Sequence, residues 1–70
     1  MEHEDVLQRI RAEREDHDES QRYVAAKLGM TQSQYQKYES GKTVLSVRAL
    51  IAICKHFHVS AAYLLGLPNN

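Results

Sequence analysis

The chain has 70 residues, a formal net charge of zero and one cysteine, Cys54. We expect one small domain spanning residues 1–70, with neither an intrachain disulfide nor a four-ligand Cys/His zinc site. No apolar run approaches the roughly 18 residues of a membrane-spanning helix, and the acidic N-terminus argues against a signal peptide. These features predict a cytoplasmic protein with no membrane partner.

Helical periodicity runs through every segment long enough to judge, and no strand-like alternation interrupts it. The pattern predicts five short helices over about residues 5–16, 20–28, 31–40, 46–57 and 60–65. Residues suited to N-caps open the last four: Ser20, Thr31, Ser46 and Ser60. Glycines suited to helix ends close three of them: Gly29, Gly41 and Gly66. The predicted fold class is all-α, with the five helices around one core.

Apolar residues recur at core spacing within these helices. The first helix carries Val6, Leu7, Ile10 and Arg14 on one face, and the second carries Val24, Ala25 and Leu28. Tyr35 and Tyr38 are the inward residues of the third. The fourth has the strongest amphipathic stripe: Val47, Leu50, Ile51, Cys54 and Phe57. The last short helix carries Ala61, Leu64 and Leu65.

Residues 21–41 (QRYVAAKLGMTQSQYQKYESG) place two short helices on either side of a tight turn at Gly29, the arrangement of a helix-turn-helix. The outer face of the second helix carries amide, hydroxyl and lysine side chains. Five positions share that face: 32, 33, 36, 37 and 40. Because a Gln carboxamide can pair bidentately with adenine in the major groove, this helix is a candidate reader of base edges.

Charge is distributed unevenly along the chain. Residues 2–19 contain eight acids and three arginines, a net charge of −5. Residues 20–55 contain six basic residues and one acid, Glu39, a net charge of +5. Contact with phosphates needs local positive charge rather than a basic total, so this segment fits a DNA partner. The alternative is the ordinary scatter of charges over small helices.

Four segments, in this order, resemble the Xre/Cro-type helix-turn-helix family of phage repressors and small bacterial regulators: RIRAERED, SQRYVAAKLG, MTQSQYQKYESGK and VSAAYLLG. They extend over roughly residues 6–67. The resemblance implies a compact five-helix phage-repressor-like DNA-binding domain. It also implies a bacterial or phage origin and a location at the nucleoid.

The resemblance further implies roles for individual residues. Base contacts are implied at Gln32, Ser33 and Lys37. Phosphate contacts are implied after the recognition helix at Ser40, Lys42 and Thr43. Gln21 resembles a glutamine that binds a backbone phosphate and braces the first residue of the recognition helix. The helix N-terminus at Thr31 adds amide donors near a phosphate.

Arg14 and Glu39 resemble a structural ion pair that fixes the recognition helix to the first helix. Glu39 is the single acid of residues 20–55, which is hard to explain beside a phosphate-binding face unless it has a partner. The alternative is a solvated glutamate. The chain departs from the family pattern at four places: Glu13, Asp18, Glu19 and Leu45-Ser46. We expect the acids among them to weaken the junction of the first two helices and to add negative charge close to the DNA.

Other residues admit two interpretations. Gln34 and Gln36 are either further base or phosphate contacts or solvated helix formers, and Lys37 either contacts a base or faces solvent. The proximity of Cys54, His56 and His58 suggests a metal site, but their spacing and the lack of a fourth ligand favour structural roles. No His–acid pair accompanies the serines, so we predict neither an enzyme, nor a metal site, nor a cofactor.

The sequence therefore predicts sequence-specific binding of double-stranded DNA by a small transcriptional regulator, a repressor, with the third helix in the major groove. A homodimer on a pseudo-palindromic operator would read half-sites one DNA turn apart. Its interface is expected at Tyr63, Leu64 and Leu67, although ordinary packing explains these residues equally well. The alternative function is an antitoxin or a protein-interaction adaptor that keeps the fold, with or without DNA binding.

Overall fold

The computed structural model describes residues 3–67, which form five helices and no strand. The helices are α1 (His3–Asp16), α2 (Gln21–Lys27), α3 (Gln32–Ser40), α4 (Val47–Phe57) and α5 (Ala61–Leu65). The predicted all-α fold class is confirmed. α1 begins two residues earlier than expected, and the other helices begin one residue later because the expected ranges included the capping residue.

Four helices begin in the same way, with a hydroxyl that accepts a hydrogen bond from the backbone N–H three residues ahead. Ser20 caps α2, Thr31 caps α3, Ser46 caps α4 and Ser60 caps α5, at 3.0–3.1 Å. Each cap satisfies one of the amide groups that a helix start leaves without an intrahelical partner. The sequence identified all four.

Glycine sets the two boundaries of α3. Gly29, in the turn before it, has φ +74°, and Gly41, at its end, has φ +83°. Both angles lie in the left-handed region, which costs other residues more than glycine. Gly41 is also crowded, because a Cβ there would lie 3.2 Å from Leu7 Cδ1, whereas a Cβ at Gly29 would meet nothing within 4 Å. Gly41 therefore brings the end of α3 close to α1.

The core draws on all five helices. Its largest fully buried side chains are Tyr35, Ile10, Ile53, Leu64 and Val24. Tyr35 faces inward from α3, as expected, so that the amide-rich face of that helix is left on the outside. Burial of this apolar surface is the main favourable contribution to folding.

The buried stripe of α4 differs from the one that the sequence predicted. Val47 and Ile51 are 73% and 49% exposed, whereas Ala49 and Ile53 are buried together with Phe57. The predicted stripe is therefore on the wrong side of the helix: it included the exposed Val47 and Ile51 and left out Ala49 and Ile53. In α5, likewise, Ala61 is exposed and Leu64 is buried.

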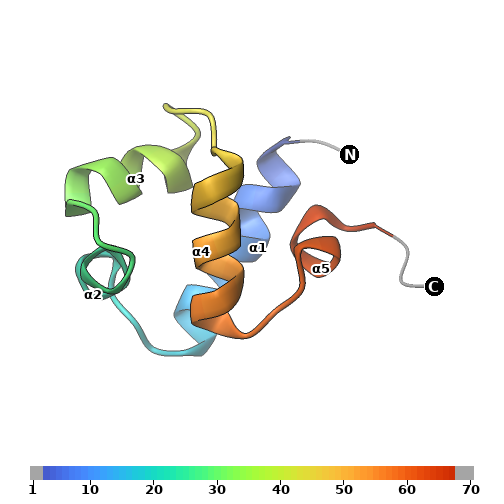
Figure 1. Ribbon diagram of the computed structural model, residues 1–70, viewed down its shortest axis with the longest axis horizontal. Helices are drawn as coiled ribbons and strands as arrows, with labels where there is room; N and C mark the ends of the chain where they lie inside the picture. Colours follow the sequence, from blue (N-terminus) through green and yellow to red (C-terminus); the bar gives the residue numbers. More distant parts are fainter. Residues whose placement is uncertain (1–2, 68–70) are drawn as a thin grey trace.

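The helices are arranged so that α2 and α3 lie at one end of the long axis and α5 at the other, with α4 and α1 between them (Figure 1). α3 contacts both α1 and α2, and α5 contacts α1 and α4. The two helices of the helix-turn-helix are thus held as a pair on one side of the protein, and α1 links them to the rest.

Candidate nucleic-acid interface

The outer face of α3 is a continuous polar surface. Its residues are all exposed: Gln32, Ser33, Gln36, Lys37 and Ser40. They lie opposite Tyr35, which is fully buried, and the first turn of the helix carries no acidic residue. A helix with this composition offers donors and acceptors to base edges without a carboxylate to repel phosphates.

The two flanks of α3 face different neighbours. Gln34 borders a shallow cleft toward α4, where Tyr38 and Arg48 also lie. Gln36 borders a second cleft, toward α1 and α2. The two glutamines that the sequence left undecided are therefore on opposite sides of the recognition face. Of the two, Gln36 lies on the same face as Gln32.

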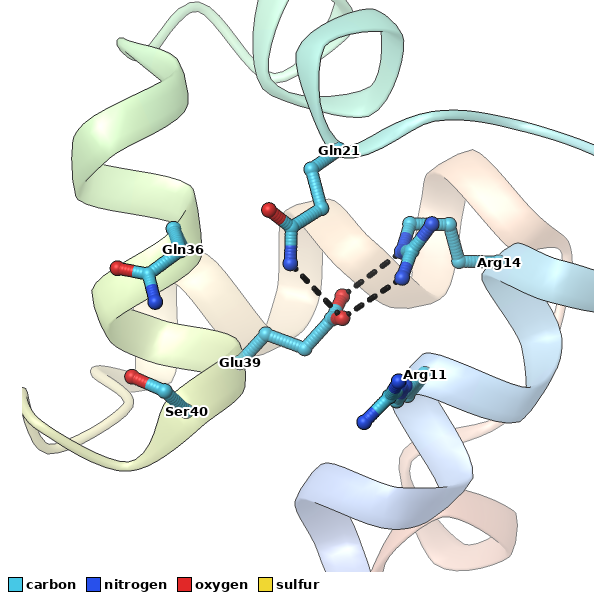
Figure 2. A pocket seen from close by; sticks show the side chains of 6 residues that line it. All are labelled: Arg11, Arg14, Gln21, Gln36, Glu39 and Ser40. Atoms are coloured by element: carbon cyan, nitrogen blue, oxygen red, sulfur yellow. Dashed lines mark hydrogen bonds and ion pairs between the residues drawn. The ribbon is translucent and has the colours of Figure 1, made fainter.

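An ion pair joins α3 to α1 beneath this surface (Figure 2). Arg14 donates from Nε to Glu39 Oε2 at 3.0 Å and from Nη2 to Glu39 Oε1 at 2.9 Å, the fork geometry in which arginine binds carboxylates most strongly. The side chains of Arg14 and Glu39 are 13% and 4% exposed. The structure thus brings together the two residues that the sequence paired.

Two more contacts extend this cluster. Gln21 Nε2 donates to Glu39 Oε1 at 3.2 Å, so Gln21 attaches α2 to the end of α3 rather than to its first residue, Gln32 (Figure 2). Arg14 Nη1 donates to the carbonyl oxygen of Glu19 at 3.0 Å, which fixes the connection between α1 and α2. One carboxylate and one guanidinium therefore set the relative positions of three helices.

The charged states of the cluster follow from its surroundings. Burial by itself raises the pKa of Glu39, but the hydrogen bonds from Arg14 and Gln21 outweigh it and hold the pKa below its ordinary value. The hydrogen bond to Glu39 raises the pKa of Arg14. Burial, with the neighbouring carboxylate, raises the pKa of Tyr35 far above its ordinary value. Glu39 and Arg14 are thus both charged at neutral pH, and Tyr35 is neutral.

The segment after α3 folds back onto the helix. Thr43 N donates to Lys37 O at 3.1 Å, and the Ser40 hydroxyl donates to the same carbonyl oxygen at 3.3 Å. The side chains of Lys42 and Thr43 stay exposed, beside that of Ser40. At the other end of α3, Thr31 is exposed; its hydroxyl accepts from the amide of Gln34, and the other amide groups of the first turn have no intrahelical partner.

Sequence reasoning missed a second polar contact, which joins the connection before α2 to α4. Glu19 Oε1 and His56 Nε2 are 2.7 Å apart, and the imidazole packs edge-on against Phe57 with ring centroids 4.7 Å apart. We expected Glu19 to weaken the junction of the first two helices, but its side chain joins that junction to α4. No local signal predicts this pair, because 37 positions separate its members.

The residues that the sequence suggested for a metal site do not form one in the part of the chain that the structure describes. Cys54 is partly buried against the core, and burial raises the pKa of its thiol. Within residues 3–67 there is no group of three His, Cys, Asp or Glu side chains that could hold a metal ion. The same range contains no helix long and apolar enough to cross a membrane.

Comparison with known proteins completes the description. The family model described as helix-turn-helix matches residues 10–64, well over half of the chain. The matched segment begins within α1, contains α2, α3 and α4 in full, and ends within α5. A search of curated proteins and a search of solved structures each returned no match.

Proposed function

Because the chain belongs to the Xre/Cro-like helix-turn-helix family, a family of DNA-binding regulators, we propose that it represses transcription by binding a specific double-stranded operator with α3 in the major groove. The observation that carries this proposal is the exposed amide and hydroxyl face of α3, free of acids and fixed from behind by the Arg14–Glu39 pair. We place this activity in the bacterial cytoplasm.

The exposed residues divide into two groups by their chemistry. Gln32, Ser33 and Lys37 carry the choice of base, since Gln matches the edge of adenine and Lys can reach the acceptors of guanine. Lys42 and Thr43, with Ser40 and the amide groups at Thr31, bind phosphates and fix the position of α3 along the duplex. Gln21 has one amide hydrogen directed to Glu39 and a second one available for a phosphate.

The proposed regulator binds as a homodimer on a pseudo-palindromic operator. Leu64, which the sequence assigned to the interface, is fully buried in the core and is not available to a partner. Tyr63 and Leu67 are 50% and 54% exposed, on or directly after α5. Such an operator requires the two α3 helices of the dimer to lie ~34 Å apart, the length of one DNA turn.

Selection of bound sequences from a random DNA pool tests this function directly. Enrichment of a two-fold symmetric site supports it, and recovery of unselected sequences contradicts it. With the selected site, Gln32→Ala should relax the preference at one base pair by ~1–3 kcal/mol, and Lys42→Ala should weaken all sequences alike. The function is wrong if neither change alters binding in a gel shift.

A second candidate function, an antitoxin or protein-interaction adaptor, is favoured by one observation. The end of α1 and the connection that follows it carry exposed acids, at Glu15, Asp16 and Asp18. A basic partner protein could bind there. Salt dependence distinguishes the two, because DNA binding falls steeply with ionic strength in proportion to the phosphates neutralised.

A further inference from the structure

A polar cleft of about 190 Å³ opens between α1, α2 and α3, beside the recognition face. Six residues line it: Arg11, Arg14, Gln21, Gln36, Glu39 and Ser40 (Figure 2). Gln36 and Ser40 belong at the same time to the exposed face of α3. The cleft therefore continues the candidate DNA surface toward α1, where neither the sequence nor the family resemblance placed a contact.

The negative charge of Glu39, at the floor of the cleft, is already compensated. Both oxygens of Glu39 accept hydrogen bonds from Arg14, and Oε1 accepts another from Gln21. Because these donors already bind both of its oxygens, the carboxylate has little capacity left for a cation. What the walls offer is donors: the Gln21 and Gln36 amides and the Ser40 hydroxyl, whose bond to Lys37 O is long at 3.3 Å.

Arg11 supplies the charge. Its side chain is 65% exposed and extends from α1 toward the cleft (Figure 2). Its one described ionic contact is with Glu15, one turn further along α1, at 3.4 Å between Nε and Oε2. An exposed pair of this kind contributes little to stability, so a doubly bonded phosphate can displace it at low cost.

We propose that this cleft binds one phosphate of the DNA backbone, with Arg11 as the cation and Gln36 and Ser40 as neutral donors. The phosphate belongs to the strand that borders the groove read by α3, because Gln36 lies on the same helix face as Gln32. Glu15 competes with the phosphate for Arg11. This inference rests on the proposed DNA binding and adds a contact on α1 to it.

The test measures the affinity for the selected operator as a function of salt for the full chain and for Arg11→Gln. Each charged phosphate contact contributes about 0.9 to the slope of log affinity against log salt. Between 50 and 200 mM salt, the affinity of the unchanged protein should therefore fall about three- to fourfold more than that of Arg11→Gln. The loss should be equal on operator and unrelated DNA, since a phosphate carries no sequence information.

Lys55→Gln is the matched control. It removes the same charge from an exposed position on α4 that does not line the cleft, and should leave the slope nearly unchanged. Glu15→Gln adds a second measurement. It should tighten binding in the unchanged background and do so much less when combined with Arg11→Gln. Thermal melting should show all variants folded, because the Arg11–Glu15 pair is exposed.

The outcomes separate this inference from the function on which it rests. If the unchanged protein binds DNA and Arg11→Gln shows the same slope, the cleft holds no phosphate while the DNA-binding function stands. A loss confined to the operator would also overturn the inference, since it would assign Arg11 to a base. If the unchanged protein selects no DNA, both proposals are wrong.

Discussion

Glu39 is an acid placed directly behind the surface that we propose to bind phosphates. The structure resolves this conflict by enclosing the carboxylate, which is 4% exposed, and by directing donors from α1 and α2 at both of its oxygens. The positive charge of Arg14 thereby compensates the negative charge of the carboxylate beneath the surface of α3. The same arrangement makes Glu39 depend on its partners, because a buried carboxylate without a counter-charge is costly.

Arg14→Ala should therefore destabilise the protein strongly. It leaves the Glu39 carboxylate buried with Gln21 as its remaining side-chain donor among the described hydrogen bonds, and breaking a buried pair from one side costs about 3–5 kcal/mol. Urea unfolding followed by circular dichroism measures the loss. Arg11→Ala, which removes an exposed ion pair, is the control and should change stability by less than about 0.5 kcal/mol. Similar losses of stability in the two variants would show that the buried pair contributes no more than the exposed pair.

Glu39 should also make stability depend on pH in the acidic range. Its pKa is lower in the folded protein than the ordinary value, so folding is favoured where the carboxylate is ionised in both states. This contribution is complete above the ordinary glutamate pKa of about 4.3 and is lost as the pH falls through the folded value. Glu39→Gln should lack this part of the acid sensitivity. Thermal unfolding between pH 6 and pH 2 measures it, and parallel curves for both proteins would contradict the assignment.

At the scale of the helices, local sequence signals were sufficient to predict where helices begin and end, but not which face of α4 is buried. The N-caps Ser20 and Ser46 and the closing Gly41 were predictable because capping is decided within a few residues. The buried stripe of α4 was not, because burial depends on which side of the helix its neighbours occupy. Val47 and Ile51 have the apolar character of core residues but face outward.

The two glycines on either side of α3 allow the cost of side-chain crowding to be measured at a similar backbone strain. Gly29→Ala and Gly41→Ala both place a side chain at positive φ, which costs about 1–2 kcal/mol. Gly41→Ala should cost more, since its Cβ would lie 3.2 Å from Leu7 Cδ1, whereas Gly29→Ala meets no atom within 4 Å. Melting temperatures of the two variants give the comparison. Equal losses would mean that Leu7 shifts without cost.

The candidate site was predictable in the parts that lie on one helix. The exposed row from Gln32 to Ser40 follows from helical spacing, and the Arg14–Glu39 pair followed from the family resemblance. The Glu19–His56 pair and the position of Arg11 beside Gln36 and Ser40 were not predictable. Both depend on how separate helices approach each other, which no local pattern in one sequence records.

For the whole molecule, the basic residues at the recognition face and the apolar residues of α5 lie on different parts of the protein. The basic residues of α3 and of the loop that follows it lie toward one end of the long axis, and α5 lies at the other (Figure 1). A protein with zero formal net charge can thus present a local positive surface to phosphates. The same arrangement leaves α5 away from the proposed DNA contact of α3, so the proposed homodimer can form through α5.

Tyr63→Ser should therefore weaken cooperative binding without unfolding the protein. Tyr63 is half-exposed, so the free monomer loses little when it is replaced, whereas a dimer that packs through it loses a large aromatic contact. Binding to a two-fold operator should fall, and binding to a single half-site should stay the same. Anisotropy titrations with both DNAs, together with sedimentation of the free protein, measure the difference. Ile51→Ser, an equally exposed apolar residue on α4, is the control. If it has the larger effect, two copies meet through α4 instead.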